Sequence, residues 1–135
     1  MPINDLARSD TVTAGPETPV VELAATMDEE SVGSVVITTD GAPVGIVTDR
    51  DLTVRVLGAE TDPAALTAAD VMTTELCTIE SAAGFYEATS LMAEHGVRRL
   101  PVCEGETLVG IITADDLTEL LADEQQQLGD VVRAQ

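Results

Sequence analysis

The stretch GIVTDRDL at residues 45–52 recurs as GIITADDL at residues 110–117, an offset of 65. Five of the eight positions are identical, and ungapped matches continue at Thr13/Thr78, Glu22/Glu87, Met27/Met92, Val32/Val97 and Val44/Val109. A repeat of this kind determines the architecture, because each copy is one structural unit that packs on its neighbour. We therefore predict that the chain is a duplication of a single unit.

The two copies share one order of predicted elements. Apolar residues at helical spacing predict helices over 18–29 and 83–95, and again over 49–57 and 114–122. Stretches at 11–14 and 76–79 precede the first helices and predict strands. In the first copy, Asp40-Gly41 between two apolar runs predicts a β-hairpin. The hairpin strands are expected at 34–38, 43–47, 100–103 and 108–112, so the unit is β-α-β-β-α.

The predicted fold class is therefore α+β, with helices and strands mixed along the chain. A unit of about 55 residues is marginally stable alone, so we expect the two pseudo-symmetric repeats to pack through their sheets into one module. The predicted domains are a first repeat at 1–60, a linker at 61–70, a second repeat at 71–123 and a polar tail at 124–135. Loop character begins at Gly58, and the tail is expected to be helical at first and then frayed.

The charge of the chain excludes several classes of partner. Six basic residues face 25 acidic ones, so the net charge is −19 and the isoelectric point is about 4.1. Non-specific nucleic-acid binding and docking on anionic membranes both depend on Lys and Arg. No apolar run approaches the roughly 20 residues that a membrane span needs, and no signal peptide is visible. We expect a cytoplasmic protein that binds neither nucleic acid nor membrane.

The composition has a second unusual feature, because all six basic residues are Arg and Lys is absent. An acidic surface without Lys is typical of the proteins of salt-accumulating halophilic archaea. Molar salt shrinks the Debye length to roughly 3 Å, which screens the self-repulsion of such a surface. The composition thus favours a haloarchaeal protein, and the alternative is an acidic cytosolic protein of another source.

Three stretches of the second repeat carry a resemblance to a known family. They are MTTELCTIES, EHGVRRLPVCEG and LVGIITADDL, and the first repeat has TVTAGPETPVVELAATM, SVGSVVITTDG and PVGIVTDRDL in the same order. Over about residues 5–123, the chain resembles the tandem cystathionine-β-synthase (CBS) domain pair, or Bateman module. The resemblance implies a regulatory module that senses adenosine nucleotides, forms a homodimer and signals to a protein target that the sequence does not identify.

The motif Thr-x-x-Asp stands between a strand and a helix in both copies, as Thr48-x-x-Asp51 and Thr113-x-x-Asp116. Helix capping alone explains it, because Thr accepts from the amide three residues on while the acid reaches back. The same helix start also suits a nucleotide, since free amides and a Thr hydroxyl favour phosphate and a carboxylate accepts from a ribose diol. The two interpretations do not exclude one another.

The resemblance also implies that each ligand site is built across the pseudo-twofold axis, in clefts between the repeats. The first site would combine one motif with residues of the second repeat and is expected to contain Thr48, Asp51, Val71, Met72, Val97, Arg98 and Arg99. The second would use an N-terminal stretch near residues 10–12 and is expected to contain Thr113, Asp116, Val32, Gly33 and Ser34. Neighbouring strand residues point to opposite faces, so only one of Arg98 and Arg99 should face a given site. Arginine pairs with phosphate bidentately, and the alternative is pairing with nearby carboxylates.

The resemblance implies a ligand-binding function, and the residues leave one alternative to it. The expected ligands are AMP, ADP or ATP, with S-adenosylmethionine ranked after them and no obligatory cofactor. The alternative is a structural dimerisation or interaction module whose motifs only cap helices. With one His and no metal-ligand spacing, the sequence predicts no catalytic residues, no metal site and no enzyme. His95 is expected to complement a helix C-terminus, and Cys77 and Cys103 to be buried as small apolar residues.

Overall fold

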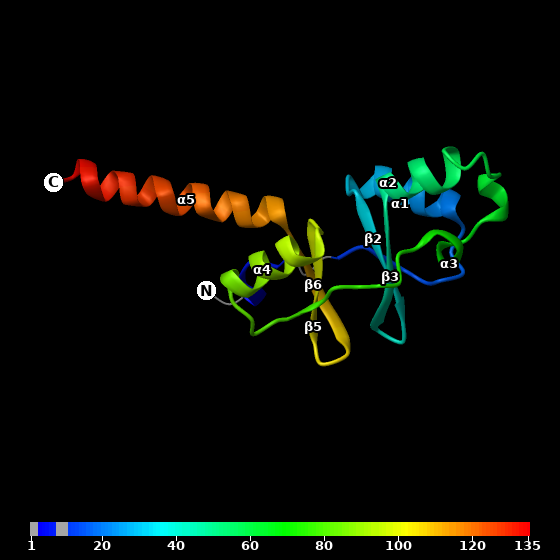
Figure 1. Cartoon of the computed structure of the whole chain (residues 1–135), viewed down its shortest axis with the longest axis horizontal. Helices are drawn as coiled ribbons and strands as arrows, with labels where there is room; N and C mark the ends of the chain where they lie inside the picture. Colours follow the sequence, from blue (N-terminus) through cyan, green and yellow to red (C-terminus); the bar gives the residue numbers. More distant parts are fainter. Residues whose placement is uncertain (1–2, 8–10) are drawn as a thin grey trace. The chain divides into compact units, whose positions relative to one another are not determined.

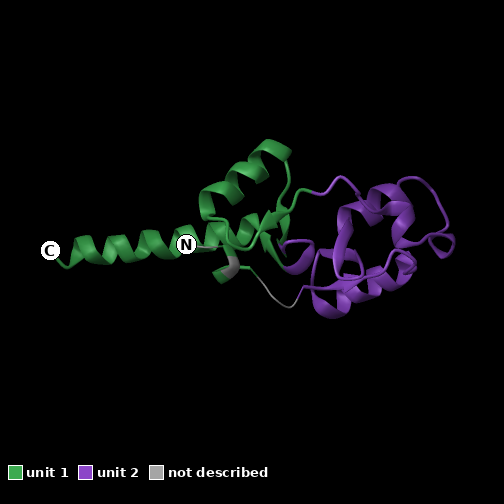
Figure 2. Cartoon of the chain, turned by 90° about the horizontal axis from the view of Figure 1, so that it is seen from below, with its two compact units in different colours: residues 1–9, 77–103, 110–135 green, residues 10–76, 104–109 purple. Residues whose placement is uncertain are grey.

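The computed structural model describes residues 3–7 and 11–135, apart from the side chain of Asn4. The chain divides into two compact units (Figure 2). Unit 1 comprises residues 1–9, 77–103 and 110–135, and unit 2 comprises residues 10–76 and 104–109. Each contains helices and β-strands, which confirms the predicted α+β class.

In unit 2, a three-stranded sheet carries one helix between its first two strands. The elements are β1 (Thr13–Ala14), α1 (Val20–Glu30), β2 (Ser34–Thr39) and β3 (Ala42–Thr48), and the sheet order is β1-β2-β3 (Figure 1). Strand β1 runs parallel to β2, and β2 runs antiparallel to β3. Asp40 and Gly41 have φ angles of 53° and 81° at the hairpin turn, the conformation that an Asp-Gly pair favours. The predicted β-α-β-β order is therefore confirmed here.

The helix predicted over 49–57 is present, but it changes from α-helical to π-helical turns along its length. It consists of α2 (Asp49–Asp51) and η2 (Leu52–Leu57), whose turns are π-helical. The amide of Gly58 donates to the carbonyl of Thr53 at 2.7 Å, a spacing of five residues. Such wide turns are rare and often occur at functional sites.

The segment expected as a linker contains ordered structure. It holds η3 (Pro63–Ala65) and the start of α3 (Ala68–Val71). Ala68 and Val71 are 0% and 2% exposed in the core of unit 2. Helices of three or four residues have no visible period in a sequence, so this packing could not be predicted.

Unit 1 has the corresponding elements of the second repeat. They are β4 (Ile79–Glu80), α4 (Phe85–His95), β5 (Arg99–Glu104), β6 (Thr107–Thr113) and α5 (Ala114–Arg133), with the sheet order β4-β5-β6 (Figure 1). The turn of this second hairpin, residues 104–109, is grouped with unit 2, where the amide of Leu108 donates to the carbonyl of Gly41 at 3.0 Å. Unit 1 also contains the short helix η1 (Ile3–Asp5), and Ile3 is completely buried.

The predicted end of the last helix is wrong. Helix α5 has 20 residues in all and does not stop near Ala122 but continues to Arg133, through the segment expected to fray (Figure 1). The run of Glu and Gln at 124–127 suggested a polar tail, but these residues are good helix formers and extend the helix. No helix within the described residues is both long and apolar enough to span a membrane.

The buried side chains among the described residues are all apolar. In unit 2 they come from α1, the sheet, η2 and α3, as Val20, Leu23, Met27, Val35, Ile37, Val47, Val56, Ala68 and Val71. Cys103 is buried in the other unit, as expected, whereas Cys77 is only half-buried. Burial raises the pKa of both thiols, and Glu94 near Cys77 and Glu80 near Cys103 raise it further.

The two equivalent helices α1 and α4 end differently, which leads to a stability prediction. Ser31 follows α1 with φ 54°, and Gly96, 65 positions later, follows α4 with φ 64°. This left-handed conformation costs a residue with a Cβ atom about 1 kcal/mol. We expect Ser31→Gly to raise the free energy of unfolding by about 1 kcal/mol and Gly96→Ser to lower it similarly. A Cβ atom at Gly96 would have no atom within 4 Å apart from those of its chain neighbours, so a steric clash would not account for a loss of stability in Gly96→Ser. Urea unfolding measures the change, and equal stability of Gly96→Ser and the wild type would contradict a cost of the left-handed conformation.

Candidate functional site

Both Thr-x-x-Asp motifs form complete capping boxes in the structure. Thr48 Oγ1 accepts from the amide of Asp51 at 3.2 Å, and Asp51 Oδ2 accepts from the amide of Thr48 at 2.9 Å. The corresponding distances for Thr113 and Asp116 are 3.1 and 3.0 Å. The capping interpretation is therefore confirmed. A ligand could contact only those hydrogen-bonding groups of the two motifs that the capping bonds do not already use.

Comparison with a third Thr-x-x-Asp, at Thr67 and Asp70, shows that the first two motifs keep a hydroxyl proton available. Here Asp70 Oδ2 accepts from the amide of Thr67 at 2.8 Å and also from its hydroxyl at 3.2 Å. The hydroxyl proton of Thr67 is thus used within the motif. At Thr48 and Thr113 the hydroxyl instead accepts from an amide and keeps its proton to donate, for example to a phosphate oxygen.

In unit 2 an arginine joins three of the predicted site residues. Arg55 Nη1 donates to the carbonyl of Val71 at 2.8 Å and lies 3.4 Å from that of Met72. Its Nε lies 3.7 Å from Asp51 Oδ1. The side chain of Asp51 is 15% exposed and that of Arg55 is 47% exposed, so a positive charge stands at the edge of the motif.

The segment with Val71 and Met72 lies along β3, beside the same motif. Ile46 and Thr73 exchange two backbone hydrogen bonds of 3.0 and 3.1 Å. The side chain of Met72 covers the α-carbon of Gly45, where a Cβ would collide with it. Strand β3 therefore holds Thr48, Asp51, Val71 and Met72 in one cluster, which we call the Thr48 cluster.

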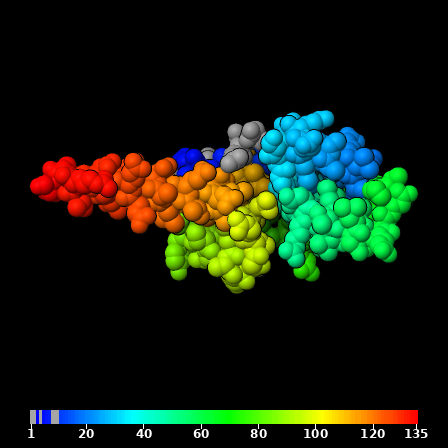
Figure 3. Space-filling view, turned by 90° about the horizontal axis from the view of Figure 1, so that it is seen from above, coloured from blue at the N-terminus to red at the C-terminus, as the bar shows by residue number. Residues whose placement is uncertain are grey.

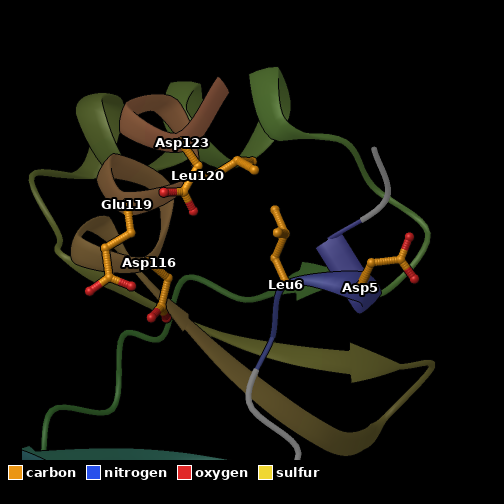
Figure 4. A pocket seen from close by; sticks show the side chains of 6 residues that line it. All are labelled: Asp5, Leu6, Asp116, Glu119, Leu120 and Asp123. Carbon is orange, nitrogen blue, oxygen red and sulfur yellow. The ribbon is translucent and has the colours of Figure 1, made fainter. Parts of the chain in front are cut away.

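Unit 1 contains the equivalent cluster with a different charge. At the offset of 65, Leu6 corresponds to Val71 and Leu120 to Arg55, and both line a depression of about 240 Å³. Figure 4 shows Leu6 pointing toward the first turns of α5. The depression, which we call the Asp116 cluster, is lined by Asp5, Leu6, Asp116, Glu119, Leu120 and Asp123. Four of these six lining residues are carboxylates and none is a cation, whereas Arg55 lies beside Asp51 in the other cluster.

The remaining predicted residues lie next to the motif of their own repeat. Ser34 is the register partner of Thr48, and the carbonyl of Gly33 accepts from the amide of Asp49 at 3.0 Å. The carbonyl of Arg98 accepts from the amide of Ala114 at 2.8 Å, beside Thr113. Val32, Gly33 and Ser34 are thus in unit 2, and Val97, Arg98 and Arg99 are in unit 1. Assignment of these residues across the repeats stays a prediction, and the expected contribution of residue 10 lies outside the described residues.

The two adjacent arginines differ in exposure. The Arg98 guanidinium is 3.1 Å from Asp115 Oδ1, and both side chains are more than two-thirds exposed at 70% and 79%. Arg99 is half-buried at the start of β5. The alternative was that both arginines pair with nearby carboxylates, and this ion pair bears it out for Arg98 alone. An exposed pair of this kind is weak and does not hold the side chain firmly.

Sequence reasoning missed Arg55, although a signal was present. Arg55 follows Asp51 by four residues in a predicted helix, and side chains at this spacing meet on one face. Its bonds to the carbonyls of Val71 and Met72 could not have been found, because α3 was not predicted. Arg50 is exposed within the first turn of α2.

Comparison with known proteins identifies the family. A family model described as CBS domain matches residues 3–58 and 68–123, two stretches related by the same offset of 65. The chain belongs to the CBS domain family. The match of two CBS domains confirms the family and the duplication, and it begins the second copy at Ala68, within the segment expected as a linker.

Relatives and solved structures agree with this assignment. The chain is 36% identical over 120 residues to an uncharacterized protein of Methanopyrus kandleri, covering 87% of this chain and 61% of that protein. It therefore spans less than two thirds of that relative. The structure of a CBS protein from Burkholderia ambifaria has a TM-score of 0.85 at 26% identity, over 93% of this chain and 96% of that one.

A third comparison shows a CBS pair with ligands. The CBS pair of protein MJ0100, crystallised with 5′-methylthioadenosine and S-adenosylmethionine, has a TM-score of 0.83 at 21% identity. The similarity covers 92% of this chain and 98% of that one, and at this identity it shows the fold alone. Within the part of the chain that the structure describes, no group of three or more His, Cys, Asp or Glu residues could hold a metal ion.

Proposed function

We propose that this CBS pair is a regulatory module that binds an adenosine nucleotide at the Thr48 cluster. The observation that carries the proposal is the position of Arg55, which brings a positive charge to Asp51 and to the carbonyls of Val71 and Met72. A Thr hydroxyl with a free proton and a cation suit phosphate, and a carboxylate suits the ribose diol. Backbone groups near Val71 and Met72 would read the adenine edge.

Two further considerations support an adenosine ligand. The CBS pair of MJ0100 shares the fold and holds two adenosine compounds, so adenosine derivatives are the class to test first. The near absence of aromatic residues also disfavours recognition by stacking, and leaves aliphatic side chains and backbone groups to hold the base. AMP, ADP and ATP rank before S-adenosylmethionine, because Arg55 lies against the Thr48 cluster and its charge suits a phosphate group.

The nucleotide would act by stabilising the conformation that binds it better, and the change would pass to a protein partner. We further propose that the module works as a cytoplasmic homodimer in a salt-rich cell, as the acidic, Lys-free composition indicates. The residues assigned to the second site, Thr113 and Asp116 with Val32, Gly33 and Ser34, form a separate proposal. The carboxylates of the Asp116 cluster make that site the weaker one for a phosphorylated ligand.

The alternative is a ligand-free interaction module, which the complete capping boxes favour because they account for both motifs without a ligand. Calorimetric titration of the purified protein with AMP, ADP, ATP and S-adenosylmethionine separates the two. It should be done in molar KCl, which screens the net charge of −19, after any co-purified nucleotide has been identified and removed. We expect saturable binding of at least one nucleotide. A folded, ligand-free protein that binds none of the four would establish the interaction module instead.

A further inference from the structure

Helix α5 extends beyond the region that the family model matches. The match ends at Asp123, and the helix continues for ten more residues to Arg133. Four of its large apolar side chains are exposed: Leu121 by 53%, just before the end of the match, and Leu128 by 67%, Val131 by 59% and Val132 by 72% beyond it. Figure 3 shows the C-terminal half of α5, in red, with no other segment over it on that face.

Three of these four apolar residues follow the spacing of a coiled coil, together with the buried Leu117 and the acidic Glu124. Leu117, Leu121, Glu124, Leu128 and Val131 are separated by steps of 4, 3, 4 and 3 residues, which places them on one stripe of the helix. Leu117 is 3% exposed in the core of unit 1, so the stripe begins inside the unit and runs out of it. The exposed apolar residues of the stripe therefore continue the line that begins with the buried Leu117.

The extension is poorly suited to stand alone. Isolated helices shorter than about 12–15 residues are marginal in water, and helical stability in proteins comes mainly from packing of an apolar face. Gly129, Val131 and Val132 lower the intrinsic helix propensity further. The helix is therefore expected to be covered along the stripe by another apolar helix.

The charged residues of α5 favour one orientation for its pairing with α5 of a second copy of this chain. In a parallel pair, Glu124 would face Glu124 of the second copy within the apolar seam, and like charges there are costly. In an antiparallel pair with Leu121 opposite Val131, Glu124 lies opposite Leu128 and can extend its carboxylate to water. The antiparallel arrangement also brings the end with Arg133 toward the acidic first turns of the other helix, and it opposes the two helix dipoles.

We propose that α5 pairs antiparallel with α5 of a second copy, through the stripe formed by Leu121, Leu128 and Val131. In this pair the stripe of each copy packs against the same stripe of the other copy, as a twofold-symmetric dimer requires. Six acidic residues of each α5 oppose the association, so it strengthens as salt rises toward molar concentrations. This pairing rests on the homodimer proposed above and supplies its interface, but it does not depend on nucleotide binding.

The mass of the protein in solution tests the pairing. Sedimentation in molar KCl should show a dimer for the wild type, and Leu128→Glu should weaken the dimer at least tenfold. Gln126→Glu adds the same charge to an exposed position of α5 outside the stripe and should leave the dimer constant unchanged. A monomeric wild type, or equal dimerisation of wild type and Leu128→Glu, would overturn the proposal and leave the stripe to a different partner protein. Circular dichroism verifies that both variants remain helical.

Cross-linking tests the orientation. In a Cys77→Ser, Cys103→Ala background, equimolar Leu121→Cys and Val131→Cys proteins are mixed and oxidised. The antiparallel pair should give mainly the mixed disulfide between the two different variants. Predominant Leu121→Cys homodimers would overturn the antiparallel arrangement. If the background does not fold, sedimentation of an equimolar mixture of wild type and Glu124→Lys in molar KCl replaces this test. The antiparallel pair predicts no stronger association in the mixture than in the two proteins alone, and a clearly stronger mixed dimer, in which opposite charges face each other at position 124, overturns it.

Discussion

Asp51→Asn should raise the dissociation constant of the nucleotide about tenfold to a hundredfold. Hydrogen bonds to a charged group contribute about 1.5–3 kcal/mol, and the ribose diol would lose a carboxylate as its acceptor. Asparagine keeps an oxygen that accepts from the amide of Thr48, so the capping box survives. Calorimetric titration in molar KCl measures the change.

The sign of the effect distinguishes direct contact from general electrostatics. If Asp51 only repelled phosphate, removal of its charge would tighten binding. Asp49→Asn is the matched control, because it removes the same charge from the same helical turn at an exposed position. We expect equal or slightly tighter binding for this control. Tighter binding by Asp51→Asn would exclude the carboxylate as the acceptor of the diol. Loss of binding in Asp116→Asn alone would move the nucleotide to the Asp116 cluster.

Leu23→Ala should lower the free energy of unfolding by about 2–5 kcal/mol, the largest effect on stability expected of the substitutions considered. Leu23 is 1% exposed in α1 and packs in the cluster with Val20, Met27, Val35 and Ile37. Removal of a buried leucine side chain costs its transfer free energy and leaves a cavity that the neighbours fill only in part. Since domains of this size are stable by only about 5–15 kcal/mol, the variant is close to unfolding.

Val21→Ala provides the control two positions earlier in the same helix. Val21 is 56% exposed, so its truncation should change the free energy of unfolding by less than about 0.5 kcal/mol. Unfolding is followed by far-ultraviolet circular dichroism, because the chain has no Trp. Urea is the suitable denaturant, since guanidinium chloride would itself change the ionic strength. Equal losses of stability in the two variants would contradict the assignment of Leu23 to the core.

Features with a strong local signature could be predicted from the sequence. The offset of 65 appears again in the family match, and Asp40-Gly41 makes the expected turn with two positive φ angles. The capping boxes at Thr48 and Thr113 follow from their residue types, because Thr and Asp three positions apart satisfy each other's amides. Local chemistry determined each of these features, so no tertiary information was needed.

Features that depend on distant packing could not be predicted. Helix α3 has four residues and is stabilised by the burial of Ala68 and Val71, which no periodicity shows. The stripe on α5 was hidden because Glu124 and three Gln residues separate Leu121 from Leu128. For the site, both motifs were found but Arg55 was not, since its partners are carbonyls 16 and 17 residues away in the chain.

The burial of Ile3 and Ala68 has a consequence for how such a chain could arise. Both are first residues of a CBS match, yet Ile3 packs in the unit of the second repeat and Ala68 in the unit of the first. Each repeat thus contributes its opening helical segment, η1 or α3, to the unit of the other repeat. Cleavage between the repeats would deprive both halves of a core segment. A chain with a single repeat could therefore complete this core only by exchanging the opening segment with a second copy of itself.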